Sequence, residues 1–168
     1  MSFPSLRILE MAAREGFDAV HIDAEHGEWA PPEVDDHVRL AHGYGLSVTA
    51  RVPSVLSEAG AFMINLFLDR GIQGILAPHV ETAAQTRALV DACLFPPAGQ
   101  RSWGDGRGTE FNDDEVLNNK WGGKTEFMRW SNENMLVSAQ IESKPVRVCR
   151  PCTYCTSPRW LLLPRQGE

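Results

Sequence analysis

The sequence predicts an α/β fold in which parallel strands alternate with helices. Short β-prone segments and longer helix-prone segments alternate along residues 1–143. Polar residues at the ends of the predicted strands recur at Asp23, Arg51 and 78–79, roughly 27 residues apart. Strand–helix units of this size require parallel strands joined by helical crossovers, which excludes all-α and all-β folds. The spacing does not separate a closed barrel from an open, doubly wound sheet.

The predicted helices share apolar residues at helical spacing and a clear start or stop signal. Gly16 and Gly71 lie where the first and third helices end, whereas Pro31 and Pro32 occupy the first turn of the second. The predicted helices are 5–15, 31–43, 59–69, 82–94 and a helical region over 113–130. The strands predicted between them are 17–22, 46–52, 74–80 and 136–142.

Composition and charge exclude several classes of protein. The chain has 168 residues and a formal net charge of −6, which fits one domain and argues against a general nucleic-acid binder. No apolar run approaches the roughly 18 residues of a membrane helix. Acids and arginines occupy the N-terminus where a signal peptide has its apolar stretch. We therefore expect a cytoplasmic protein that binds neither nucleic acid nor membrane.

The composition changes sharply after Ser143. Residues 144–168 carry a charge of +4, against −10 for 1–143, and contain three of the four cysteines. They show neither the two-residue nor the 3.6-residue apolar period of a folded element. The sequence therefore predicts a folded part over 1–143 and a Cys/Arg/Pro-rich tail over 144–168 that is not folded.

The predicted strand ends gather residue types that suit catalysis. In parallel α/β folds, functional groups cluster at the carboxyl ends of the strands. Carboxylates there can hold a divalent cation, an arginine fork can bind a carboxylate, and a histidine can move a proton. The candidates are Asp23, Glu25, His26, Arg51, His79, Gln140 and Glu142.

Simpler structural interpretations exist for the same residues. Asp23 could cap the turn at Gly27, and Arg51 could be a surface or ion-pairing residue. His26 alone would more often be structural or solvated. The functional interpretation depends on their shared placement at the ends of successive units.

Four segments resemble one family in the correct order. GFDAVHIDAEHGEW at 16–29 is similar to the D-x-E-H-G signature of the HpcH/HpaI aldolase/citrate lyase family, and ARVPS at 50–54 to its R-V-P segment. The run 71–104 resembles its P-x-V-E-T and P-P-x-G-x-R-x-x-G motifs, and SAQIES at 138–143 its Q-I-E strand. The resemblance covers roughly residues 5–143.

This resemblance implies part of a TIM-type (β/α)8 barrel, namely strands two to five with their helices. It also implies a divalent-metal-dependent aldolase that cleaves 4-hydroxy-2-oxo acids to pyruvate, or a related 2-oxo acid, and an aldehyde. The ion would be Mg²⁺, Mn²⁺ or Co²⁺. The partners would be the small 2-oxo acid and the aldehyde, and full-length relatives are homo-oligomers.

The resemblance also implies a role for each site residue. Glu142 would be one of two carboxylate ligands of the metal, and Gln140 would line the 2-oxo acid site. Arg51 would bind the keto oxygen. His26, held by Asp23 and supported by Glu25, would transfer a proton. The glycine-rich loop 99–108 would shape the mouth of the site.

The sequence departs from the family after Ser143, where the strand that carries the second metal-binding aspartate is missing. The alternative is therefore a catalytically incompetent, truncated fragment of such an aldolase. Cys149, Cys152 and Cys155 have the C-x2-C-x2-C spacing of iron–sulfur or zinc sites, with Cys93 as a distant fourth ligand. Translation out of frame or through an intron would also produce such a tail.

Overall fold

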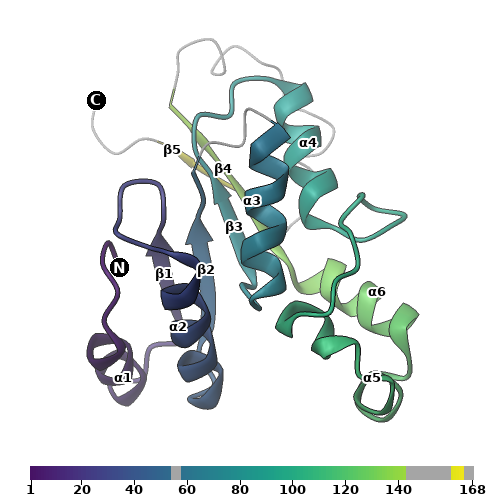
Figure 1. Cartoon of the computed structure of the whole chain (residues 1–168). Coiled ribbons are helices and arrows are strands. Elements are labelled where there is room, and N and C mark those ends of the chain that lie inside the picture. Colours follow the sequence, from purple (N-terminus) through teal and green to yellow (C-terminus); the bar gives the residue numbers. More distant parts are fainter. Residues whose placement is uncertain (54–57, 143–159, 165–168) are drawn as a thin grey trace.

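Five parallel strands form one sheet in the computed structural model, which describes residues 1–53, 58–142 and 160–164 (Figure 1). Each strand pairs with the next in chain order. The strands are β1 (Ala19–Asp23), β2 (Ser47–Arg51), β3 (Gly74–Ala77), β4 (Leu136–Ile141) and β5 (Trp160–Pro164). The prediction of a parallel α/β fold is confirmed.

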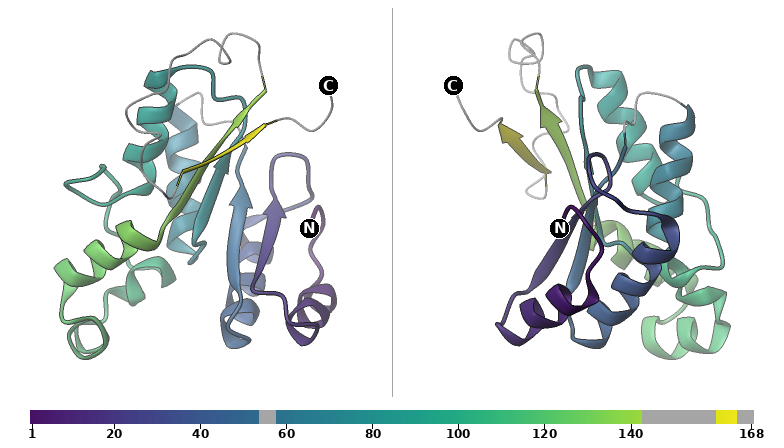
Figure 2. Two further views of the ribbon diagram at one scale, coloured as in Figure 1. Left: turned by 180° about the vertical axis from the view of Figure 1, so that it is seen from behind. Right: turned by 60° about the vertical axis from the view of Figure 1, so that its left-hand side comes forward.

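Helices cover one face of this sheet (Figure 2). The α-helices are α1 (Leu6–Arg14), α2 (Pro31–Gly43), α3 (Glu58–Asp69), α4 (Ala83–Cys93), α5 (Asp114–Trp121) and α6 (Lys124–Asn134), and η1 (Arg107–Asn112) is a 3-10 helix. Helices α5 and α6 lie beyond the amino ends of the strands (Figure 1). Within the described ranges, none of the helices has the length and apolar character needed to cross a membrane.

The strands bury alternate side chains against the helices. Val20 and Ile22 on β1 and Val48 and Ala50 on β2 are buried, whereas their neighbours in the sequence point to the opposite face. Because successive side chains of a strand point to opposite faces, one face of the sheet forms the core and the other carries polar groups. The polar face continues to the carboxyl ends of the strands, where the candidate residues lie.

The helical region predicted over 113–130 is two helices. Gly122 and Gly123 separate α5 from α6 with φ angles of 81° and 112°. Glycine adopts these angles readily because it has no Cβ. Asp113 begins α5, since its side chain accepts hydrogen bonds from the backbone N–H groups of Glu115 and Val116.

The strand β5 lies within the tail for which the sequence analysis expects no folded element. It pairs with β4 from Val137↔Trp160 to Ile141↔Pro164. The segment WLLLP is a continuous apolar run, which is typical of parallel strands and does not show the alternation of a half-buried strand. Residues 143–159 and 165–168, which include the three tail cysteines, lie outside the described residues.

Cys93 does not lie in a position to ligate a metal. It is 1% exposed and packs within the core between the helices and the sheet. Burial raises the pKa of its thiol to about 12, and metal ligation requires the thiolate. The structure therefore gives no support to Cys93 as the fourth ligand of a cysteine cluster.

This burial predicts that Cys93 is protected from alkylation in the native protein. At pH 8 the thiolate fraction of Cys93 should be about 10³-fold below that of an ordinary thiol. Iodoacetamide treatment followed by peptide mass spectrometry should find Cys93 unmodified in buffer. It should find Cys93 modified in about 8 M urea, which unfolds the protein. Equal modification under both conditions would show that Cys93 is not in the core.

Candidate active site

The candidate residues meet at the carboxyl ends of the strands. Asp23 and Arg51 are the last residues of β1 and β2 and lie opposite each other in the strand register. Glu25 follows β1, His79 follows β3 and Glu142 follows β4. Parallel pairing brings these ends to one edge of the sheet, as the spacing in the sequence predicts.

Arg51 forms a fork with Asp23. Its Nε and Nη2 atoms donate to Asp23 Oδ1 and Oδ2 at 2.8 and 2.6 Å. Its Nη1 lies 3.1 Å from Glu25 Oε2. The Arg51 guanidinium, by hydrogen bonding, lowers the pKa of Asp23 to about 2. Contacts with described residues use three of the five guanidinium N–H donors.

The Asp23 carboxylate also shapes the turn after β1. Its Oδ1 accepts hydrogen bonds from the backbone N–H groups of Glu25 and His26 at 3.2 and 3.3 Å. A Cβ at Gly27 would collide with the carbonyl oxygens of Asp23 and Ser2, so this position requires glycine. Asp23 therefore both caps the turn and pairs with Arg51, and these contacts fix the position of Glu25.

His79 joins two of the three carboxylates of the site, Glu25 and Glu142. Its Nε2 lies 3.2 Å from Glu25 Oε1, and its Nδ1 lies 3.2 Å from Glu142 Oε2. Its backbone N–H also donates to Glu142 Oε2 at 3.1 Å. The φ angle of His79 is 55°, a left-handed conformation uncommon outside glycine. The recurring spacing of the sequence places His79 among the strand-end residues, but the motifs give it no role.

Asp23 holds His26 through its backbone N–H, whereas the His26 ring lies beside Glu25. The ring is 70% exposed, and its Nε2 lies 3.6 Å from Glu25 Oε2. Asp23 accepts the backbone N–H of His26 while its carboxylate faces Arg51. Glu25 is thus the carboxylate nearest to the His26 ring.

Gln140 lies two residues before Glu142 and therefore on the same face of β4. Its Oε1 is buried and has no hydrogen-bond partner among the described residues. An acceptor in this state is available to a ligand, since buried polar groups are normally paired. In the described part of the chain, no group of three or more His, Cys, Asp or Glu residues could hold a metal ion.

The glycine-rich loop 99–108 lies at the other end of the sheet and does not shape the mouth of this site. Helix α4 returns the chain to the amino ends of the strands before the loop begins (Figure 1). There Gly106 and Gly108 pack against the carbonyl oxygens of Asp69 and Leu68, at the end of α3. The expected position of the loop is therefore wrong.

Comparison with known sequences identifies the family of the chain. A sequence model of the family described as HpcH/HpaI aldolase/citrate lyase matches residues 4–146. A 4-hydroxy-2-oxovalerate aldolase from Novosphingobium aromaticivorans is 34% identical over 137 residues, which cover 81% of this chain and 47% of that relative. A 4-hydroxy-4-methyl-2-oxoglutarate aldolase from Hapsidospora irregularis is 40% identical over 98 residues, covering 58% and 35%. The chain spans about half or less of the length of these relatives.

Solved structures give the same result for the fold. An HpcH/HpaI aldolase from Desulfitobacterium hafniense matches with a TM-score of 0.71 at 26% identity, covering 85% of this chain and 52% of that one. Macrophomate synthase matches with a TM-score of 0.70 at 26% identity, covering 86% and 47%. The prediction of a partial TIM-type barrel is confirmed, because the chain matches about half of each of these structures.

The Asp23–Arg51 fork predicts a pH-dependent contribution to stability. The folded state lowers the pKa of Asp23 from 3.8 to about 2, so the contribution is complete above pH 4 and is lost as the pH falls towards 2. Asp23→Asn should lower the free energy of unfolding by about 1–3 kcal/mol at pH 6. Urea unfolding between pH 6 and pH 2.5 should show this difference shrinking with acidity.

Asp18→Asn is the matched control for this measurement, because Asp18 lies just before the same strand with an exposed side chain. It should show no comparable loss at pH 6. A difference between Asp23→Asn and the parent chain that does not change with pH would contradict the assigned ion pair.

Proposed function

We propose that this chain, which belongs to the HpcH/HpaI aldolase/citrate lyase family, carries the 2-oxo acid side of a carbon–carbon lyase site. The reaction would cleave a 4-hydroxy-2-oxo acid to pyruvate, or a related 2-oxo acid, and an aldehyde. The names of the two relatives above support this class of substrate for those proteins. The observation that carries the proposal is the fixed Arg51 guanidinium at the carboxyl end of β2.

Arg51 is suited to bind the keto oxygen of the substrate. Cleavage next to a 2-oxo group leaves an enolate, so negative charge develops on this oxygen. Hydrogen-bond donors that are fixed before the reaction stabilise such charge without reorganisation. The fork to Asp23 and the contact with Glu25 hold Arg51 in place, and the two remaining donors would face the substrate.

A divalent ion, Mg²⁺, Mn²⁺ or Co²⁺, forms part of the proposal. The carboxylate of Glu142 and the orphaned Oε1 of Gln140 are oxygen donors on one strand face, which is the chemistry that hard cations prefer. They fit one side of a metal site, and the described residues do not complete it. When bound, such an ion would polarise the 2-oxo acid as a Lewis acid.

His26 is the proposed proton-transfer group. Its ring is exposed beside Glu25, and from there it would take the proton of the 4-hydroxyl of the substrate. Histidine is the side chain best suited to move protons near neutral pH. Glu25 lies between His26, Arg51 and His79, so it would keep the relative positions of these three groups.

The test is the release of pyruvate from 4-hydroxy-2-oxovalerate by the purified chain, measured with and without Mn²⁺ and after EDTA. We expect metal-dependent release that EDTA abolishes. Arg51→Lys should lower kcat/KM by about 10²–10³-fold, because lysine cannot reproduce the planar fork. Glu142→Gln should remove the response to metal.

Arg14→Gln provides the matched control, since Arg14 lies on the exposed side of α1 and pairs only with Glu10 among described residues. Pyruvate binding by calorimetry separates binding from turnover. Binding that depends on Arg51 without turnover would support the alternative of a catalytically incompetent fragment. Absence of both binding and turnover would refute the proposed site.

A further inference from the structure

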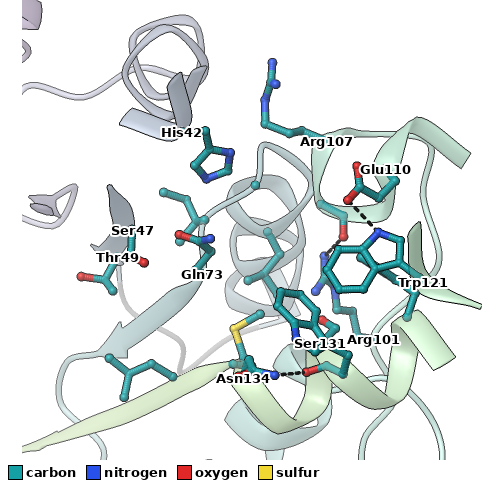
Figure 3. A pocket seen from close by; sticks show the side chains of 18 of the residues that line it. His42, Ser47, Thr49, Gln73, Arg101, Arg107, Glu110, Trp121, Ser131 and Asn134 are labelled. Atoms are coloured by element: carbon teal, nitrogen blue, oxygen red, sulfur yellow. Dashed lines mark hydrogen bonds between the residues drawn. The ribbon is translucent and has the colours of Figure 1, made fainter. Parts of the chain in front are cut away.

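A cavity lies at the amino ends of the strands, whereas Asp23 and Arg51 lie at the carboxyl ends. Figure 3 shows it from close by. It has a volume of about 680 Å³, within the range of small-molecule sites. Its walls come from the amino ends of β2 and β4, from η1 and from helices α5 and α6. The proposed aldolase chemistry does not use this cavity.

The cavity contains a buried and poorly paired cation. Arg101 is 3% exposed and lines the cavity. Its Nη2 donates one long hydrogen bond of 3.4 Å to the carbonyl of Gly108, and its guanidinium lies 4.4 Å from the centre of the Phe95 ring. Its Nε has no partner, and no described carboxylate lies within ion-pair distance of it. Burial lowers the pKa of Arg101 to about 10, so the group remains charged near neutral pH.

Such a charge is costly without an anion. Removing an ionised group from water without pairing it is strongly unfavourable. Asp69 is the carboxylate whose charge acts on Arg101, but no ion pair joins these two described residues. Glu110 on the cavity wall is engaged by Lys120 at 2.8 Å and by Trp121 Nε1 at 2.9 Å. Among the described residues, Arg101 therefore has no directly paired carboxylate.

Two other nitrogen atoms of the wall are unpartnered. His42 Nε2 and Arg107 Nε are buried and have no hydrogen-bond partner among the described residues. Figure 3 shows the guanidinium of Arg107 directed away from Arg101, and its Nη2 lies 4.0 Å from Asp35. Lys120 pairs with Glu110 and Arg107 with Asp35, so Arg101 is the cation of the described wall that has no ion pair. His42 also lines the cavity.

One part of the wall is aromatic. The rings of Trp121 and Trp130 lie 4.3 Å apart, and Phe127 lies 5.1 Å from Trp121. Trp130 is 43% exposed and Phe111 is 58% exposed, although both line the cavity. Exposed aromatic side chains around a hollow commonly mark a binding surface, and flat rings favour flat ligands.

We propose that this cavity binds a small planar organic carboxylate. The carboxylate would pair with Arg101, whose planar fork matches it geometrically, and the planar body would lie against Trp121 and Trp130. The choice of ligand depends on both the Arg101 cation and the aromatic rings of the wall. A phosphate ion would use the cation without the aromatic rings, and a neutral aromatic molecule would leave the cation unpaired.

Benzoate is the probe, titrated by calorimetry into the full chain. Benzamide has the same shape without the charge, and acetate has the charge without the ring. We expect saturable benzoate binding at least about tenfold tighter than that of either control, which corresponds to roughly 1.4 kcal/mol. Equal affinity for benzamide would refute the role of Arg101, and equal affinity for acetate would refute the role of the aromatic wall.

Variants locate the binding. Arg101→Met should abolish benzoate binding, Arg101→Lys should weaken it, and Arg14→Gln on the exposed side of α1 should leave it unchanged. If Arg101→Met fails to fold, Trp130→Ala provides the independent test, because its side chain is half-exposed. Arg51→Lys should not change benzoate binding, which separates this site from the proposed aldolase site. Absence of saturation by benzoate, or full binding by a folded Arg101→Met, overturns the proposal.

Discussion

The fork between Arg51 and Asp23 is the interaction on which the candidate active site depends. It joins the ends of β1 and β2, and the same Asp23 carboxylate holds the turn that carries Glu25 and His26. Glu25 in turn contacts His79, which reaches Glu142 at the end of β4. One charged pair thus orders a chain of contacts across four strands. Removing Asp23 would therefore disturb residues that it does not touch, which is the usual behaviour of a hydrogen-bonded network.

The residues that stabilise the fold and those that suit chemistry occupy different parts of the sheet. Buried aliphatic side chains such as Ile22, Val48 and Ile75 pack against the helices on one face. The carboxyl ends carry the polar network, and the amino ends carry the cavity beside Arg101. Substitutions in the core should act through packing, whereas those at the strand ends should act through charge and hydrogen bonding. Because the polar groups of both sites lie at the ends of the strands, they do not interrupt the apolar core.

The sequence predicts parallel strands and the line of residues at the strand ends because both follow from spacing. The partners of individual side chains do not follow from it: Asp23 faces Arg51 and leaves the His26 ring to Glu25, a choice made by side-chain geometry. The position of loop 99–108 depends on where α4 ends, which the glycine motif does not encode. The cavity beside Arg101 is lined by His42, Arg101 and Trp121, among others. These residues lie far apart in the sequence and share no motif, so only the folded chain brings them together.

The His79 ring lies between two carboxylates of the candidate active site. It contacts Glu25 and Glu142 with its two ring nitrogens, and only a protonated imidazole can donate to both. The two carboxylates are therefore linked by a group that can bear positive charge. A metal ion on Glu142 would compete with His79 for the same oxygen, Oε2, which also accepts the His79 backbone N–H. Because the left-handed backbone of His79 fixes that N–H, the ring would move more readily than the main chain. Metal binding at Glu142 would thus be coupled to the position of the His79 ring, and through Glu25 to Arg51.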